Sequence, residues 1–225
     1  IHGALGPRSN TGISDREMTL AQLCKQKGYS TAVFGKWHLG HHPKFLPLQH
    51  GFDEYFGLPY SNDMWPLHPN YTKLPPNAAK RKQGYPNLPL IEGNQVIDSE
   101  VTGDDQTQLT TWYTEHAVRF IEQNRDRPFF LYVPHPAPHY PYQGPDDLPN
   151  RTIRQGPQPT DLPQEQVAPR LKGVEAARAY REMVIDLDTQ VGRIVDVLDA
   201  CGIRDNTLLV FCSDNGGIAK PGLGG

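Results

Sequence analysis

Hydrophobic and polar positions along this chain change between helical and strand periodicity, and the first such change lies near the N-terminus. Apolar side chains recur at helical intervals over residues 18–24, and an apolar run at residues 30–35 follows. Ser14 and Glu17 have the spacing of a capping box, so we expect the helix to begin there and to end at Gly28. A short apolar strand after such a helix is typical of a buried strand in a parallel sheet.

Two further helix–strand units repeat this pattern. A helical face over residues 109–121 is followed by an apolar strand at residues 129–133. The clearest amphipathic stripe occupies residues 180–201, is closed by Gly202, and precedes a strand predicted at residues 207–212. The sequence therefore predicts an α/β fold with a mainly parallel central sheet flanked by helices.

The segments between these units are less regular. Residues 43–60 carry repeated aromatic side chains and two glycines, and we interpret them as a compact irregular segment over the sheet edge. The proline-rich residues 66–89 and 141–169 are predicted to form long surface loops, while residues 90–97 favour a small hairpin.

Each predicted strand is followed by a polar loop with candidate site residues: Lys36 and His38 after the first, His135 and His139 after the second, and Asp214 and Asn215 after the third. The carboxyl ends of parallel strands share one edge of a sheet, which is where α/β folds bind ligands. We therefore expect these loops to converge, although they are far apart in the sequence.

Taken singly, each of these loops has a structural explanation. Lys36 could be a surface charge, and His38 a half-buried histidine bonded to the backbone. The prolines around His139 also suit a rigid loop without a site, and Asp214 and Asn215 before two glycines suit a turn or a helix cap. The interpretation as a site depends on all three strands ending in such loops together.

The residue types share one chemistry. Carboxylate and amide oxygens, as in Asp214 and Asn215, are ligands of a hard cation such as Ca²⁺ or Mg²⁺. Lys36 supplies a positive charge with three donors, and His38 and His139 supply donors or proton carriers near neutral pH. Together they would bind a tetrahedral oxyanion and stabilise charge on its oxygens.

Composition narrows the classes of partner. The 225 residues are 37% hydrophobic and 21% charged, which is ordinary for a globular protein. A net charge of −3 gives no support to binding of nucleic acid or an anionic membrane, and no apolar run is long enough to span a bilayer. Two glycosylation-type triplets, at Asn70 and Asn150, favour an exported protein only weakly.

Three motifs resemble those of a known family. GKWHLG at residues 35–40, HPAPHYP at 135–141 and SDNGG at 213–217, together with QHGFDEYFGLPYSND at 49–63, resemble the type I sulfatases of the alkaline phosphatase superfamily, especially the arylsulfatase A-like members. The resemblance implies that the chain, residues 1–225, is part of an alkaline-phosphatase-like sulfatase catalytic domain.

The resemblance also implies roles for single residues. Residues matching Lys36 and His38 contact the sulfate and the nucleophile, and the one matching His139 acts at the leaving group. Those matching Asp214 and Asn215 bind the divalent cation, usually Ca²⁺, with Mg²⁺ as the alternative. A serine matching Ser61 assists at the site; we assign Ser61 and His135 to substrate binding.

One part of the family pattern is absent. The family nucleophile is a formylglycine made within a Cys/Ser-x-Pro/Ala-x-Arg motif, which this sequence lacks. We expect that motif upstream of Ile1 and a second active-site lysine downstream of residue 217. The chain would then be an incomplete, internal part of the domain and inactive alone.

The function implied by the resemblance is hydrolysis of sulfate monoesters. The substrate would be a sulfated small molecule, glycan or glycolipid, and the compartment lysosomal, extracellular or periplasmic. Two alternatives stay open: a phosphoester or phosphonate hydrolase of the same superfamily, and a sulfatase-like binding module without catalysis. The residues directly before Ile1 would separate the three.

Overall fold

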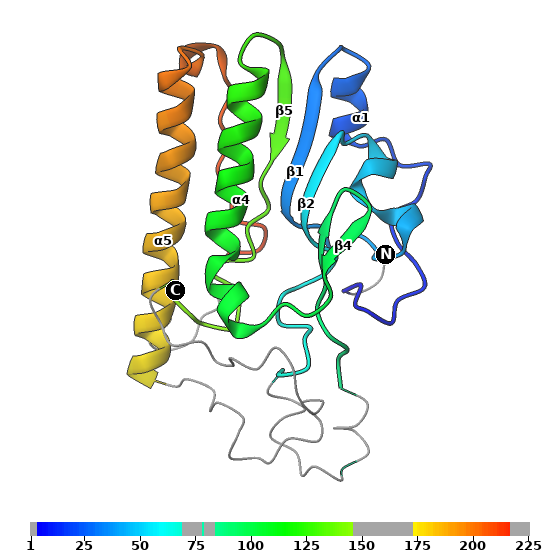
Figure 1. The fold of residues 1–225 in the computed structure, drawn as a ribbon, viewed down its shortest axis with the longest axis vertical. Coiled ribbons are helices and arrows are strands. Elements are labelled where there is room, and N and C mark those ends of the chain that lie inside the picture. The colour runs from blue at the N-terminus through cyan, green and yellow to red at the C-terminus, as the bar shows by residue number, and fades with distance from the viewer. Residues whose placement is uncertain (1–3, 69–77, 79–83, 146–172, 217–225) are drawn as a thin grey trace.

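A five-stranded sheet forms the centre of the molecule (Figure 1). The structure, a computed structural model, describes residues 4–68, 78, 84–145 and 173–216. The sheet order is β4-β3-β2-β1-β5, with the strands β1 (Ser30–Lys36), β2 (Glu54–Leu58), β3 (Leu90–Glu92), β4 (Gln95–Asp98) and β5 (Phe129–Tyr132). β1 pairs in parallel with β2 and β5, and the β3–β4 hairpin continues the sheet in antiparallel pairing. The expected α/β sheet is therefore confirmed, as is the hairpin at its edge.

Helices cover both faces of this sheet. α4 (Gly103–Asn124) packs against β1, β2 and β5, and α5 (Gly173–Ala200) lies beside α4 (Figure 1). On the other face lie α1 (Leu20–Lys25) and, between β1 and β2, two short 3-10 helices, η1 (Pro43–Phe45) and η2 (Pro47–His50). A further 3-10 helix, η4 (Arg204–Asn206), follows α5.

β1 is buried on both of its faces. Ala32 and Phe34 belong to the core shared with α4 and α5, and the Phe34 ring lies edge-on to Phe120 of α4 with centroids 6.1 Å apart. Val33 points the other way, into the core shared with Ala21 of α1. This alternation confirms the buried parallel strand predicted for residues 30–35.

α4 lies close to its predicted position, whereas α5 ends where predicted but already includes Gly173, before the stripe predicted at residues 180–201. α4 begins after a capping box in which the Thr102 hydroxyl accepts from the Asp105 amide and the Asp105 carboxylate accepts from the Thr102 amide. α5 ends at Ala200, and Gly202 takes the left-handed conformation (φ 69°) expected of a residue just beyond a helix.

The first helix begins later than the sequence predicts. Its capping box is formed by Thr19 and Gln22, and Ser14 instead closes a turn with Glu17. Thr19 has a further partner that Ser14 lacks, because its hydroxyl donates to the carbonyl of His50 at 2.6 Å. The predicted box at Ser14 and Glu17 was therefore wrong, since a tertiary contact favours Thr19 as the helix cap.

The interpretation of residues 43–60 as irregular throughout was also wrong, because they contain strand β2. Gly57 of β2 is paired with Gly35 of β1, and a Cβ at Gly57 would lie 1.9 Å from the Gly35 oxygen. The glycine that resembled a loop signal thus lies where β1 and β2 approach closely.

Residues 207–212, predicted to be the third core strand, are not part of the sheet. Leu208 and Phe211 are 90% and 72% exposed, and no backbone pairing joins this segment to a strand in the described part of the chain. A strand exists only with a neighbour that takes its backbone hydrogen bonds. The third parallel strand of the core is instead β2.

Two sequence expectations concern other parts of the chain. Among the described residues no helix is both long enough and apolar enough to cross a bilayer. Asn70 and Asn150 lie outside the described residues, so the two glycosylation triplets stay predictions.

Candidate active site at the carboxyl edge of the sheet

The loops after β1, β2 and β5 are held together by backbone hydrogen bonds. The Lys36 amide donates to the Pro134 carbonyl after β5 at 2.9 Å, and the amide of Trp37 donates to Leu58 at the end of β2, also at 2.9 Å. Gly35 permits the first contact, because a Cβ there would lie 2.3 Å from the Pro134 oxygen. Two of the three loops that were predicted to converge, those after β1 and β5, therefore meet at one edge, and the third segment that joins them is the loop after β2.

His38 is held in an unusual backbone conformation. Its φ of 57° lies in the left-handed region, which costs a residue with a side chain free energy and occurs often at functional sites. The amide of His38 donates to the Pro59 carbonyl at 3.1 Å, which fixes the residue against the β2 loop. Its ring atom Nε2 is buried and has no hydrogen-bond partner in the described part of the protein. An unpartnered buried nitrogen of this kind is available to a ligand.

Electrostatics show that Lys36, His38 and His139 lie together. Burial lowers the pKa of His38, the positive charges of Lys36 and His139 lower it further, and Asp63 opposes them. His38 is therefore neutral at neutral pH and can accept a proton or a hydrogen bond. The charges of Lys36 and His139 thus both act on the His38 ring.

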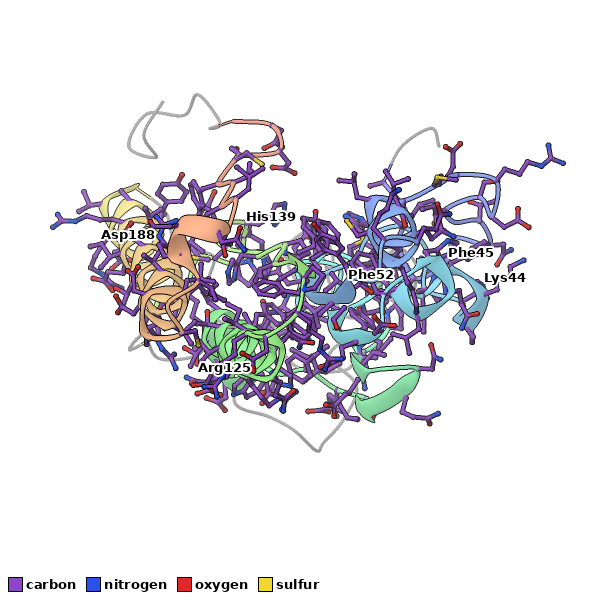
Figure 2. All side chains as sticks on the ribbon, turned by 90° about the horizontal axis from the view of Figure 1, so that it is seen from above. Lys44, Phe45, Phe52, Arg125, His139 and Asp188 are labelled. Carbon is purple, nitrogen blue, oxygen red and sulfur yellow. The ribbon has the colours of Figure 1, made fainter. Side chains whose placement is uncertain are left out.

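His139 is exposed, and one of its ring nitrogens is occupied. Its Nδ1 lies 2.9 Å from the carbonyl oxygen of Tyr140, and because a carbonyl only accepts, Nδ1 carries a hydrogen. Nε2 is then the ring nitrogen that this bond leaves available. In the view of Figure 2, His139 lies between Asp188 on α5 and Phe52 on the α1 side of the sheet.

The loop after β2 contributes side chains that the sequence only partly predicted. Ser61 is buried, and its hydroxyl faces the carboxylate of Asp63 without forming a hydrogen bond of ordinary geometry among the described residues. Asn62 is paired with Gln106 of α4 in both directions, at 3.0 and 3.1 Å. Asp63, which sequence reasoning did not nominate, lies 3.6 Å from His68. The sequence signal that could have indicated Asp63 is its position two residues after Ser61, within the sulfatase-like motif at residues 49–63.

His135 is partly buried, in a different environment from His139. Both of its ring nitrogens are shielded from solvent without partners in the described chain, and burial lowers its pKa to about 4. Its ring contacts Tyr113 of α4, with centroids 6.2 Å apart. The structure therefore places His135 against the helix and not with the exposed His139.

Asp214 and Asn215 lie on an exposed segment near β5. Burial raises the pKa of Tyr132, the last residue of β5, and the charges of Cys212 and Asp214 raise it further, so Asp214 is near that strand. Across the described residues, Asp214 has no hydrogen bond or ion pair with Lys36 or a histidine. The predicted metal pair is thus near the sheet but is not joined to the cationic group.

The donor atoms of this pair fit a cation in type but not in number. When the Asn215 amide is turned over to exchange its oxygen and nitrogen, the nitrogen donates to Asp214 Oδ1 at 3.0 Å, so the two side chains can bond to each other. No group of three or more His, Cys, Asp or Glu side chains is arranged for a metal ion within residues 4–68, 78, 84–145 and 173–216. A Ca²⁺ site normally has six or more oxygen ligands, so this pair alone is an incomplete site.

A small cavity lies beside the β2 loop. It is enclosed by the first turns of α4, the proline-rich loop after β5, and α5, and it has room for little more than one water molecule. Its lining includes Asn62, Gln106, Gln143 and Met183. A cavity of this size is too small to hold a substrate.

Comparison with known proteins agrees with this arrangement. The family model described as Sulfatase matches residues 2–224. Arylsulfatase G of Rattus norvegicus is 36% identical over 219 residues, covering 91% of this chain and 36% of the relative. N-acetylgalactosamine-6-sulfatase of Mus musculus is 32% identical over 226 residues, covering 95% of this chain and 36% of the relative. The chain thus spans little more than a third of the length of these curated relatives.

Solved structures show the same fold. The crystal structure of Ps i-CgsB has a TM-score of 0.58 and 26% identity, covering 88% of this chain and 40% of that one. PsFucS1 sulfatase from Pseudoalteromonas sp. has a TM-score of 0.61 at 24% identity, covering 84% and 36%, a likeness that concerns the fold alone. Because the family model matches almost every residue and the named relatives agree with it, this chain belongs to the sulfatase family.

Proposed function

We propose that the full-length protein containing this chain hydrolyses sulfate monoesters. The observation that carries the proposal is the group of Lys36, His38 and His139 at the carboxyl edge of the sheet, with His38 neutral and Nε2 of two histidines free of protein partners in the described chain. One cation and two imidazoles suit a tetrahedral anion that must be attacked on one side and lose an alcohol on the other.

Each of these side chains has a separate task. Lys36 donates to the non-bridging oxygens and stabilises the charge that they gain in the transition state. Neutral His38 orients the nucleophile's hydroxyl oxygen toward sulfur and accepts the proton of that hydroxyl as the oxygen attacks. As the bond from that oxygen to sulfur forms, the bond from sulfur to the alcohol oxygen breaks, and its electron pair stays on the alcohol oxygen. His139 then transfers its Nε2 proton to that oxygen, so the alcohol leaves neutral.

The nucleophile and the cation are further parts of the proposal. By family resemblance the nucleophile is a formylglycine, contributed from outside these residues. Asp214 and Asn215 would hold a Ca²⁺ or Mg²⁺ ion together with oxygen ligands from elsewhere in the protein, since two ligands are too few. When bound, such an ion withdraws charge from the sulfate oxygens.

The substrate class that we propose is a sulfated glycan, glycolipid or small molecule. N-acetylgalactosamine-6-sulfatase is named for a sulfated sugar, and Ps i-CgsB has been crystallised with k-i-k-neocarrahexaose. These names describe the relatives, and we extend them to this chain as a class only. We also propose export, to a lysosome, the cell exterior or a periplasm.

The test uses the full-length protein and two esters with the same alcohol, 4-nitrophenyl sulfate and 4-nitrophenyl phosphate. We expect the sulfate to be preferred, and Lys36→Ala to lower kcat/KM on it by about 100-fold or more, because loss of one charge-stabilising donor typically costs that much. Lys44→Ala is the matched control, since Lys44 is exposed on η1 away from the site (Figure 2).

Three results would contradict the proposal. A preference for the phosphate favours the phosphoester hydrolase. A protein inactive on both esters favours the non-catalytic binding module. Near-normal activity of Lys36→Ala on the sulfate would remove Lys36 from the mechanism.

A further inference from the structure

Asp63 is a carboxylate placed among histidines. Its side chain is 20% exposed and lies 3.6 Å from Nε2 of His68, which is 15% exposed. Burial alone would raise the pKa of Asp63, but the polar groups of His68 and Ser61 that face its carboxylate and the charges of His139 and His68 lower it below its usual value. Asp63 is therefore ionised at neutral pH despite its partial burial.

The same carboxylate acts on His38. It opposes the effects of burial, Lys36 and His139 on that imidazole. Lys36 and the protonated forms of His38, His68 and His139 carry positive charge. Asp63 is an acidic side chain that interacts with all three of these histidines. Such a charge offsets repulsion between cations in a confined site.

A role in stabilising the turn would not explain why Asp63 interacts with histidine side chains. The loop is already closed by backbone bonds, from the Met64 amide to the Ser61 carbonyl at 3.0 Å and from His68 to Trp65 at 3.1 Å. In the described residues the Asp63 carboxylate accepts no bond from a backbone amide, which is the usual partner of an aspartate that caps a turn. Its partners are side chains.

A physical connection runs from Asp63 to the loop that holds His139. The ring of His68 lies edge-on to Tyr140, with centroids 6.5 Å apart. The carbonyl of the same Tyr140 accepts from Nδ1 of His139 at 2.9 Å. The ion pair of Asp63 with His68 therefore supports the residue whose carbonyl orients the His139 ring.

We propose that Asp63 is a positioning residue for the leaving-group histidine: through His68 and Tyr140 it fixes the His139 ring with Nε2 toward the leaving oxygen, and its charge offsets the surrounding cations. This inference rests on the proposed sulfatase activity. Asp63 itself touches no reacting atom, so its effect must depend on how much the leaving oxygen needs a proton.

The experiment therefore compares two sulfate esters whose leaving oxygens differ in how much they need a proton. In the full-length protein, kcat/KM is measured for 4-nitrophenyl sulfate, whose alcohol leaves readily as an anion, and for 4-methoxyphenyl sulfate, whose alcohol is a much weaker acid. We expect Asp63→Asn to lower kcat/KM at least about tenfold more for the methoxy ester, since general-acid catalysis contributes about 10²–10⁴-fold when it is needed. Asp63→Glu should recover part of this loss.

The controls separate this role from a structural one. Asp188→Asn makes the same chemical change on the exposed side of α5 and should leave both values unchanged (Figure 2). The ratio of the two values does not depend on the folded fraction of a preparation. If Asp63→Asn does not fold, His68→Asn removes the same ion pair, and we expect from it the same selective loss.

The outcomes are distinct. Equal losses on the two esters, or no loss, would overturn the positioning role and leave the sulfatase activity in place. A wild-type protein that is inactive on both esters would overturn the proposed function and this inference with it.

Discussion

Gly57 should be the position of β2 at which a single methyl group does most damage. Its added Cβ would lie 1.9 Å from the oxygen of Gly35 and 2.7 Å from the carbonyl carbon, both backbone atoms of the neighbouring strand. No side-chain rotation can relieve that contact. Reaching an ordinary distance of 3.4 Å requires a shift from 1.9 Å, or about 1.5 Å.

A shift of that size separates β1 from β2 at the site edge. The bond from the Trp37 amide to the Leu58 carbonyl, 2.9 Å long, would exceed hydrogen-bonding distance. Loss of this bond costs about 1 kcal/mol, and overpacking typically costs about 1–3 kcal/mol. We therefore expect Gly57→Ala to lower the free energy of unfolding by about 3 kcal/mol.

The assay is urea unfolding of the full-length protein followed by circular dichroism. Gly192→Ala is the matched control, because Gly192 lies within α5 and its Cβ would have no heavy atom within 4 Å. Since alanine forms helix better than glycine, this control should gain about 0.5–1 kcal/mol. If Gly57→Ala costs less than about 1 kcal/mol, the argument from close strand approach is wrong.

Two further predictions concern pH. Burial would raise the pKa of Asp53, but hydrogen bonds from Lys25 and Thr31 lower it, so its stabilisation is present above about pH 4 and disappears as the pH falls through the lower folded-state value. Asp53→Asn should therefore lower Tm at pH 7 and have little effect near about pH 2; a deficit that persists in acid would contradict this. His135 should titrate at about 4 by NMR, because burial disfavours its charged form. A pKa near the ordinary value of about 6.5 would show that its ring is open to water.

Several features of this protein could be predicted from the sequence because they depend on neighbours along the chain. The apolar run of β1, the stripe of α5 and the glycine at position 202 are set by local periodicity and backbone preference. The meeting of Lys36 and His139 also followed, because parallel strands place their carboxyl ends at one edge.

Other features depended on partners that are distant in the sequence. Thr19 and not Ser14 caps α1, because Thr19 also reaches the carbonyl of His50. The segment at residues 207–212 has strand periodicity but no strand beside it in the described chain, and β2 is a strand because Gly57 fits against Gly35.

The candidate site shows the same division. The identities of Lys36, His38 and His139 could be predicted from motifs, whereas Asp63 resembles an ordinary turn residue until His68 and His139 are seen around it. Local sequence determined which segments form helices and strands and which loops are polar. Only the tertiary structure decided which strands pair and which charge faces which histidine, because pairing and electrostatics act between residues that the chain brings together from far apart.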